Sequence, residues 1–458
     1  MNPVLTSELR ACLARGDAAT LREFAEDFHP AALAECLEGL SAGEVAAFLS
    51  FLEPRRGAEV FSYLPTPLQL EVAERFTRQD LARLLTYMSH DERADLVKRL
   101  EPETLEALWP ALAQAEREDI RRLASYEEGT AGAVMTSDYV TLFPELTAAE
   151  ALNKIRREAP DRETVYYAYV VSPDRRLLGA VTLKDLILAR PSTLVRDILQ
   201  PDPIRVRVTD DQEEVARTIE KYDLLAVPVV DAEDRMVGIV THDDAFDILR
   251  EEQTEDLERL MGITGEPRDE PYLEVPVWTH FRRRVGWVVG LAAVGIVSGL
   301  ILHRYEDAIA RLALLAVYIP MVADTGGNTG SQSATVVIRA LALRQLSPRS
   351  ALRVLWKEFR VSVLLGAVLG GLAYAKVLWL SHESPVPPGI SLTAVAAAIA
   401  LALGLQVVSA TLVGAVLPLG AARLRLDPAV VASPAITTLV DITGLLIYFQ
   451  VVRWVLGI

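Results

Sequence analysis

The side chain of this sequence that points most directly to chemistry is Asp441, a carboxylate inside the apolar segment Ala435–Leu456. A charge at the centre of a bilayer costs roughly 2.5–3.5 kcal/mol, so an acid at that depth usually lines a water-filled path or meets a partner. We therefore interpret Asp441 as a cation site. A structural hydrogen bond between helices is the alternative interpretation.

A second polar sequence interrupts an earlier apolar segment, at Tyr318–Gln332. Pro320 removes a backbone donor there, and Gly326, Gly327 and Gly330 have no side chain that would shield the backbone carbonyls. This composition predicts a broken helix, which at membrane depth is tolerated where it is buried in protein or lines a cavity. The side-chain oxygens of the same segment belong to Asp324, Asn328 and Gln332.

These oxygens suit a hydrated magnesium ion. Mg²⁺ sheds water reluctantly, so a path for it needs neutral oxygens that contact the hydration shell and carboxylates that offset the charge. We predict that Asp441 holds the ion, while amide oxygens and glycine carbonyls contact its water. The predicted pore residues are Asp441, Asn328, Gly326, Gly327, Gln332 and Asp324. For the glycines, the alternative is a Gly326-x-x-x-Gly330 motif that only lets two helices pack closely.

Two runs of residues resemble the MgtE family of magnesium channels. They are Asp324-Thr-Gly-Gly-Asn-Thr-Gly-Ser-Gln-Ser-Ala-Thr335, preceded by Pro320, and Thr437-Thr-Leu-Val-Asp441-Ile-Thr-Gly444, preceded by Asp427-Pro428. The order of the other parts is similar too, so the resemblance covers nearly the whole chain. It implies a homodimeric channel, and not an enzyme, that takes up Mg²⁺ down its electrochemical gradient, with one Asp441 from each chain holding the ion across a two-fold axis. Passage of Mn²⁺, Co²⁺ or Ni²⁺ stays open, because oxygen ligands suit several of these ions.

Charge divides the chain into two bodies of opposite character. Residues 1–284 contain 34 Lys and Arg but 55 Asp and Glu, a net −21, whereas residues 285–458 contain 12 and 7, a net +5. This acidity argues against nucleic acid as a partner of the first body, because phosphate binding depends on cationic side chains. Cys12 and Cys36 show no disulfide or metal-thiolate spacing, so we expect buried thiols in a reducing compartment. We expect no signal peptide, because Met1–Thr20 is polar.

Hydropathy predicts five membrane spans of about 20 residues, the length that crosses a bilayer core. They are Val285–Leu302, Leu312–Leu341, Val361–Leu380, Leu392–Leu419 and Val430–Leu456. Lys and Arg are concentrated before the first span, between the second and third, and between the fourth and fifth. By the positive-inside rule we expect a multi-pass protein of the cell membrane, with its N-terminal part in the cytoplasm and its C-terminus outside.

The acidic body begins with short amphipathic helices that carry Leu at helical period up to about Ser125. Turns between them are predicted at Pro30, Ser41, Pro54, Pro65, Ser89 and Pro102. The pattern is similar to a helical superhelix of the solenoid type.

An internal repeat at an offset of 59 residues follows, in which Val170–Asp185 matches Val229–Asp244. The two strand–turn–strand–Thr-x-x-Asp units resemble a tandem of CBS domains, small α/β modules that often bind adenine nucleotides. The resemblance implies ATP as a ligand whose ribose meets the repeated hydroxyls and carboxylates. These residues are Thr182, Asp185, Thr241 and Asp244. The alternative is a Thr N-cap with an Asp in the first turn of the next helix.

An acidic connecting helix is predicted over Asp247–Gly262. Its acids Asp247, Glu251, Glu255 and Glu258 fall on one stripe and repel one another. Earlier acids in a comparable arrangement are Glu59, Asp91 and Asp95. Together they resemble the cytosolic Mg²⁺-sensing sites of the MgtE family, where the ion holds the helical domain to the CBS tandem and the connecting helix plugs the pore. A solvated acidic face is the alternative.

The predicted fold is multi-domain: an all-α superhelical N-domain, an α/β tandem of CBS domains, a connecting plug helix and a five-helix α transmembrane domain. We expect the N-domain over residues 1–128 and the two CBS domains over 129–196 and 197–246. The plug helix is expected over 247–270 and the transmembrane domain over 271–458. The predicted function is Mg²⁺ uptake gated by cytosolic Mg²⁺. Alternatives are a broader divalent-cation transporter, a membrane-tethered nucleotide sensor and a chloride channel with CBS modules, which the ions carried would distinguish.

Overall fold

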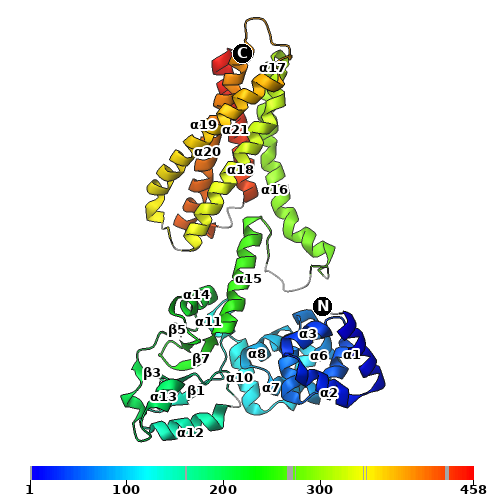
Figure 1. Ribbon diagram of the computed structural model, residues 1–458, viewed down its shortest axis with the longest axis vertical. Coiled ribbons are helices and arrows are strands. Elements are labelled where there is room, and N and C mark those ends of the chain that lie inside the picture. Colours follow the sequence, from blue (N-terminus) through cyan, green and yellow to red (C-terminus); the bar gives the residue numbers. More distant parts are fainter. Residues whose placement is uncertain are drawn as a thin grey trace. The chain divides into compact units, whose positions relative to one another are not determined.

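The computed structural model describes residues 3–159, 162–265, 272–273, 275–343, 345–346, 348–428 and 433–457. The chain forms two compact units: unit 1 is Met1–Glu252 with Arg268–Tyr272, and unit 2 is Gln253–Pro267 with Leu273–Ile458. The division falls inside one helix, α15 (His242–Leu260), which contributes residues to both units. Figure 1 colours the elements along the chain.

Unit 1 begins with a stack of short helices. They are α1 (Pro3–Arg15), α2 (Ala18–Asp27), α3 (Pro30–Leu37), α4 (Ala42–Phe51), α5 (Pro54–Ser62), α6 (Thr66–Arg75), α7 (Arg78–Tyr87), α8 (His90–Arg99), α9 (Pro102–Leu108), the 3-10 turn Trp109–Ala111 and α10 (Gln114–Ala124). Pro30, Pro54 and Pro102 occupy first helical positions, where the missing N–H has no intrahelical partner in any case. Ser41 caps α4 and exchanges hydrogen bonds with Glu44 in a capping box. The predicted turns are therefore real helix boundaries.

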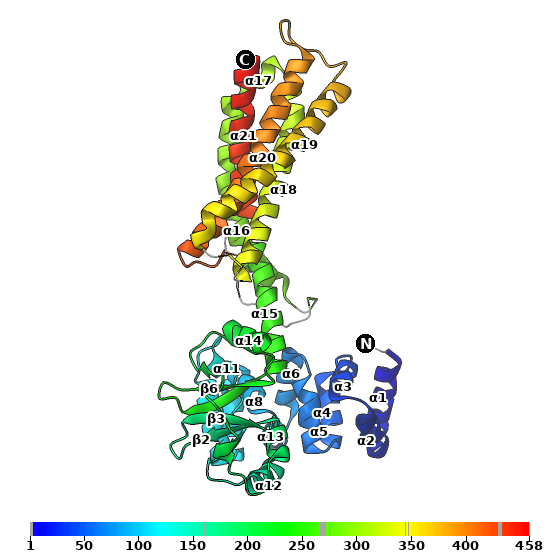
Figure 2. The same ribbon diagram turned by 60° about the vertical axis from the view of Figure 1, so that its left-hand side comes forward.

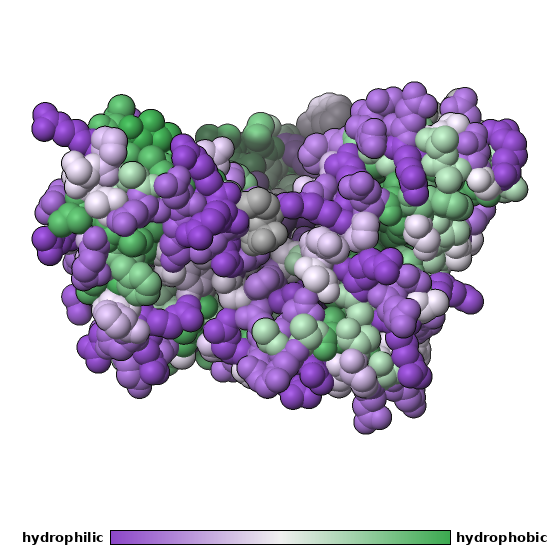
Figure 3. Space-filling view, turned by 90° about the horizontal axis from the view of Figure 1, so that it is seen from below, coloured by the Kyte–Doolittle hydropathy of each residue, from purple (hydrophilic) through white to green (hydrophobic). Residues whose placement is uncertain are grey.

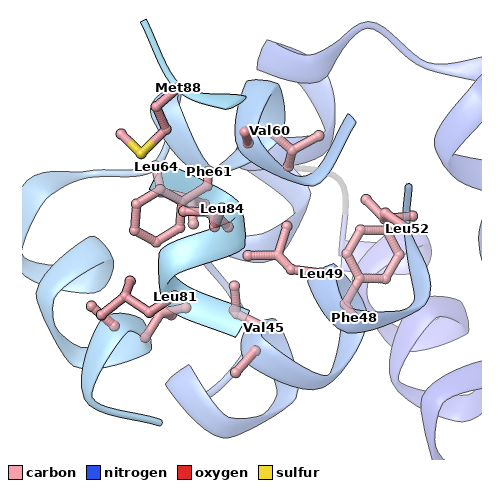
Figure 4. Close-up of a cluster of buried hydrophobic side chains, with 14 of the residues drawn as sticks. Val45, Phe48, Leu49, Leu52, Val60, Phe61, Leu64, Leu81, Leu84 and Met88 are labelled. Atoms are coloured by element: carbon pink, nitrogen blue, oxygen red, sulfur yellow. The ribbon is translucent and has the colours of Figure 1, made fainter. Parts of the chain in front are cut away.

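Helices two apart in the chain pack against each other, which produces the predicted superhelix. One row is α3, α5, α7 and α9, and the other is α4, α6, α8 and α10. Their apolar faces meet in a core around Phe48, Val60 and Phe61, none of which has exposed surface (Figure 4). Hydrophilic residues cover most of unit 1 in the view of Figure 3, as its acidic composition predicts.

Two α/β modules complete unit 1, after the short helix α11 (Ala131–Val134). The first contains β1 (Val140–Leu142), α12 (Ala148–Glu158), β2 (Tyr167–Val171), β3 (Leu177–Thr182), α13 (Leu183–Leu188) and β4 (Gln200–Pro201), with sheet order β1-β2-β3-β4. The second contains β5 (Val206–Arg207), α14 (Gln212–Tyr222), β6 (Ala226–Val230) and β7 (Met236–Thr241), with sheet order β5-β6-β7, and leads directly into α15. In each sheet a parallel pair is followed by an antiparallel pair.

The sequence repeat is reproduced in the backbone. β2 and β3 start 59 residues before β6 and β7. Each connecting turn carries a residue with positive φ at the equivalent place, Arg175 (φ 66°) and Asp234 (φ 61°). The turns also pair with each other, because Leu177 N donates to Asp234 O and Met236 N donates to Arg175 O. The predicted tandem of related modules is confirmed.

Unit 2 is a bundle of long helices that run side by side (Figures 1 and 2). They are α16 (Val277–Arg304), α18 (Leu314–Ala342), α19 (Ala351–Leu380), α20 (Leu392–Arg423) and α21 (Ser433–Leu456), with the short α17 (Glu306–Arg311) after α16. α20 packs against α18, α19 and α21, whereas α16 contacts mainly α21. The predicted five-helix domain is therefore present.

Its helices differ from the prediction in two respects. Within the described residues, four helices have the length and apolar composition of membrane spans, namely α16, α19, α20 and Pro434–Leu456 of α21. α18 is not among them, because polar residues fill its centre. The predicted break at Tyr318–Gln332 is wrong: α18 is a continuous α-helix of 29 residues with Pro320 inside it.

Candidate ion path and acidic cluster

Three polar side chains of α18 lie on one exposed face of the helix. Asp324, Asn328 and Gln332 are exposed and recur every four residues. This spacing aligns side chains along one stripe of an α-helix. We call these three residues the α18 stripe. It brings together one carboxylate and the two amides that the sequence predicted as contacts for a hydrated ion.

The glycines of α18 face the bundle instead. Gly326, Gly327 and Gly330 are buried. A Cβ atom added to Gly414 of α20 would lie 2.1 Å from the Gly330 carbonyl oxygen, so the two backbones nearly touch. The packing interpretation accounts for these glycines. Because Gly326 and Gly327 lie within an unbroken helix, they do not form the irregular backbone from which their predicted pore role was inferred.

Asp441 is half-buried on α21 and lies close enough to Asp324 for the two carboxylates to interact electrostatically. The two membrane motifs therefore meet through their acids. Two residues along α21, Thr443 Oγ1 donates to the Val440 carbonyl oxygen at 3.1 Å. The neighbour that acts on Asp441 is another acid and not a base, which leaves negative charge for a cation to offset.

Two polar side chains of this bundle were not identified from the sequence. Gln406 of α20 has no exposed surface, and its Nε2 donates to the Val440 carbonyl oxygen at 2.8 Å. Glu358 of α19 accepts a hydrogen bond from Ser333 Oγ of α18 at 2.9 Å. A signal for Gln406 was available, because it is the only amide side chain between Leu392 and Leu419.

A cluster of acids lies inside unit 1, where α8 meets the second α/β module. Asp91 of α8 lies near Asp244, Glu92 and Glu163, and we call these four residues the unit 1 acidic cluster. Asp91 Oδ1 is buried and has no hydrogen-bond partner within the described part of the chain. Burial first, and then the three neighbouring acids, hold the pKa of Asp91 well above its ordinary value.

The same surroundings raise the pKa of two further carboxyls. Burial, followed by the charges of Asp244 and Glu92, raises the pKa of Glu163 to about 7. Burial raises the pKa of Asp244 to about 6, with help from Asp243 and against hydrogen bonds from Thr241. A divalent cation would relieve the same repulsion that protons relieve. Among the residues described, no three acids or histidines are already arranged to hold a metal ion, so the cluster fits a hydrated ion or one that draws the acids together.

A buried arginine fixes α8 beside this cluster. Arg93 is 2% exposed, and its guanidinium lies 2.9 Å from Asp119 Oδ2. Asp119 also accepts a hydrogen bond from Ser137 Oγ and lies 2.9 Å from His90 Nδ1. Although burial opposes the shift, contacts led by His90 lower the pKa of Asp119. Arg93 and His90, which flank Asp91 on α8, are therefore both paired with Asp119.

Three other predicted regulatory acids each pair with a basic residue of their own helix. The pairs are Glu59–Arg56 (3.2 Å), Asp95–Lys98 (3.0 Å) and Asp247–Arg250 (3.2 Å). These three acids have basic neighbours, whereas the strongest electrostatic neighbours of Asp91 are acids.

The predicted acidic stripe of α15 is shared between the units. Asp247 and Glu251 belong to unit 1, whereas Glu255 and Glu258 belong to unit 2. Within unit 2, Glu258 pairs with Arg283 of α16. Glu255 pairs with Arg259, whose guanidinium also lies 3.2 Å from Asp427. Arginines therefore neutralise the unit 2 part of the stripe.

Thr182 caps α13, and Thr241 directly precedes α15. Thr182 Oγ1 accepts from Asp185 N at 3.1 Å and donates to the Asp185 carboxylate at 2.6 Å. Thr241 Oγ1 makes the equivalent bond to the Asp244 carboxylate. The capping interpretation describes Thr182 and Asp185, whereas Asp244 also belongs to the unit 1 acidic cluster.

Family profiles match three parts of the chain. Residues 319–451 match MgtE, described as a divalent cation transporter, residues 28–129 match the MgtE intracellular N domain, and residues 131–192 and 195–251 match CBS domains. The magnesium transporter MgtE of Thermus thermophilus is 40% identical over 459 residues, which cover 100% of this chain and 99% of that protein. The magnesium transporter MgtE of Bacillus subtilis is 31% identical over 94% of this chain and 92% of that protein.

Solved structures resemble the N-terminal half. The soluble part of a magnesium transporter is 32% identical and covers 54% of this chain and 98% of that chain, with a TM-score of 0.51. The cytosolic domain of the Mg²⁺ channel MgtE in complex with ATP is 39% identical, and the match covers 53% of this chain and 99% of that chain, with a TM-score of 0.51. Together with the full-length similarity to the Thermus protein, these matches show that the chain belongs to the MgtE family.

Proposed function

We propose that this protein is a magnesium channel of the cell membrane, in which hydrated Mg²⁺ moves inward past Asp441 and the α18 stripe. One observation carries this proposal: an exposed row of polar side chains lies beside a carboxylate in a bundle of membrane-length helices. The magnesium transporters that share its full length support the choice of ion.

The exposure of the α18 stripe favours a homodimer. A carboxylate and two amides are unfavourable against lipid tails, so they need water or protein beside them. In a two-fold dimer, the stripes of both protomers would face one axis and enclose a hydrated path. Two copies of Asp441 would then offset the charge of one Mg²⁺, while Asn328 and Gln332 contact its water.

The orientation follows from the basic residues. Arg282, Arg283 and Arg284 lie at the start of α16, and further arginines lie near the start of α19 and the end of α20. By the positive-inside rule this end of the bundle, and with it unit 1, is cytoplasmic, and the C-terminus is outside. The description of the matched N domain as intracellular supports this orientation.

Gating by cytosolic Mg²⁺ completes the proposal. In high Mg²⁺ an ion neutralises the unit 1 acidic cluster and holds α8 against the second CBS module. In low Mg²⁺ the repulsion favours separation, since like charges repel more strongly away from water. α15 begins at this cluster with Asp244, and its other end contacts the bundle through Glu258 and Arg283. This helix therefore links the sensor to the path.

Adenine nucleotide is proposed as a further ligand of the CBS tandem, because a 39% identical cytosolic domain has been solved with ATP. Calorimetric titration of the intact protein with ATP, ADP and AMP tests this ligand, and the absence of heat with all three rejects it.

The pore proposal is tested by Asp441→Asn, which keeps the shape of the side chain and removes its charge. We expect Mg²⁺ uptake into liposomes to fall at least about tenfold, the change that 1.4 kcal/mol of weaker ion binding produces. Asp307→Asn, in the exposed part of α17, removes a carboxylate from the same unit and should leave uptake unchanged. Native uptake by folded Asp441→Asn rejects the path, and competition with Mn²⁺, Co²⁺, Ni²⁺ and chloride decides between the alternative cargoes.

A further inference from the structure

Gln406 is a buried amide in the middle of the helical bundle. It has no exposed surface and lies on α20, well away from either end of that helix. Its Nε2 donates to the carbonyl oxygen of Val440 on α21 at 2.8 Å. Val440 directly precedes Asp441, so this hydrogen bond reaches the backbone at the proposed ion site.

Chemistry fixes the direction of this hydrogen bond. The Val440 carbonyl is an acceptor, so the nitrogen of Gln406 must face it. The Oε1 atom then has no hydrogen-bond partner among the described residues. A methionine would fill a similar volume without leaving a buried acceptor unpaired, so packing alone does not explain a glutamine here.

Both neighbouring helices leave room for the amide. A Cβ atom added to Gly326 of α18 would lie 2.6 Å from Gln406 Nε2, and one added to Gly444 of α21 would lie at the same distance. Gly326 belongs to the first membrane motif and Gly444 to the second. The Gln406 amide therefore lies between the two motifs and contacts a glycine of each.

We propose that Gln406 is a positioning residue that sets the separation between Asp441 and the α18 stripe. Its amide is seated between Gly326 and Gly444 while it holds the Val440 carbonyl. Thr443 also donates to that carbonyl but belongs to α21 itself, so Gln406 supplies a hydrogen bond from a different helix. The role rests on the proposed function of Asp441 and adds a residue outside both motifs.

The expected effect of losing this hydrogen bond is on ion affinity. A hydrated Mg²⁺ contacts Asp441 and the amides of the α18 stripe together, so a change in their separation weakens all these contacts at once. A residue that served only the stability of the bundle would instead lower the amount of folded protein and leave the affinity of the remaining channels unchanged.

Two substitutions separate these outcomes. Gln406→Met keeps the volume and removes the donor, and we expect it to raise the half-saturating Mg²⁺ concentration for uptake into liposomes by about tenfold. Gln406→Glu has a donor only when its carboxyl is protonated. Relative to native protein at each pH, Gln406→Glu should match Gln406→Met at pH 8 and recover as the pH falls, whereas Gln406→Met should show no such recovery.

Thr411→Val is the matched control. Thr411 also lies on α20 and is 2% exposed, but its Oγ1 donates at 2.8 Å to Val407 O of the same helix. Removing this hydroxyl deletes a buried polar group without breaking a hydrogen bond between two helices. We expect a native half-saturating concentration.

An unchanged half-saturating concentration in Gln406→Met, with only less folded protein, overturns the positioning role. If Gln406→Met does not fold, the pH profile of Gln406→Glu decides, and a flat profile overturns it. Asp441→Asn is measured in parallel. Native uptake by Asp441→Asn rejects the ion path itself. If Asp441→Asn loses uptake while Gln406→Met keeps the native half-saturating concentration, only the positioning role is rejected.

Discussion

Asp91 and Asp441 are carboxylates in places where a charge is unfavourable, and each has another acid as its electrostatic neighbour. Asp91 lies near Asp244 and Glu163 inside unit 1, and Asp441 lies near Asp324 in the bundle. A basic neighbour would neutralise such a residue permanently. An acidic neighbour leaves excess negative charge, which a reversibly bound cation offsets. In our proposal, the same residue chemistry serves both the transported and the sensed ion.

The unit 1 acidic cluster predicts that unit 1 loses stability as pH rises when Mg²⁺ is absent. The folded-state pKa values of Glu163, about 7, and Asp244, about 6, lie above the ordinary values of 4.5 and 3.8. The folded unit therefore binds more protons than the unfolded chain between about pH 4 and about pH 7, so the free energy of unfolding falls across that range. For Glu163 alone this amounts to roughly 3 kcal/mol. Calorimetry in chelator should give a lower Tm at pH 8 than at pH 5, and Mg²⁺ should reduce the difference.

Glu163→Gln should flatten this pH dependence, because it removes one of the titrating groups. Glu145→Gln is the control, since Glu145 is exposed in the same module. Both variants keep His90 and its neighbours Asp119 and Asp138, so the comparison changes one carboxyl at a time. A Tm difference that stays native in Glu163→Gln contradicts the prediction.

At the scale of elements, α18 shows what local composition does and does not determine. Pro320 and the glycines predicted a break, as helix propensity in water favours. The helix is continuous because a bilayer rewards backbone hydrogen bonds made within the segment, and because Gly330 allows α20 to pack closely. The local composition identified the polar residues of this segment, but it predicted the wrong backbone conformation for them.

Periodic features were predictable and long-range contacts were not. The helices of the N-domain and the repeat of strands follow from patterns of a few residues, so their positions could be inferred from sequence. The approach of Asp91 to Asp244 depends on how α8 packs on a module far along the chain, which no local pattern encodes. The same reason explains why the hydrogen bond between Gln406 and Val440 was missed.

The close approach of α18 and α20 predicts the effect of Gly414→Ala. The new Cβ would meet the Gly330 carbonyl oxygen at 2.1 Å, so the helices must separate. Overpacking of this kind costs about 1–3 kcal/mol, and we expect a lower Tm in detergent together with reduced Mg²⁺ uptake.

Gly420→Ala on the same helix is the control for Gly414→Ala. An added Cβ there meets nothing within 4 Å, and alanine is about 0.5–1 kcal/mol better than glycine in a helix. This variant should be as stable as the native protein or more so. If both substitutions lower the Tm equally, the loss does not come from contact between α18 and α20.

At the scale of the whole molecule, the two units share α15. This helix of 19 residues begins beside the unit 1 acidic cluster, and its end pairs with α16 through Glu258 and Arg283. Each interior residue of an α-helix is held by a backbone hydrogen bond to the turn before it. The number of residues in a helix therefore sets a rotation about the helix axis as well as a length.

Insertions can set this angle. Each added residue turns the rest of a helix by about 100° and advances it by about 1.5 Å, so two alanines after Glu252 rotate the C-terminal half by about 200°, whereas four rotate it by a net 40° or so. If rotation conveys the Mg²⁺ signal, two alanines should abolish the suppression of uptake by Mg²⁺ on the unit 1 side, and four should retain most of it. Greater harm from the longer insertion would mean that reach alone matters. If the four-residue insertion is tolerated better, the rotation left over after complete helical turns matters more than the total length of α15.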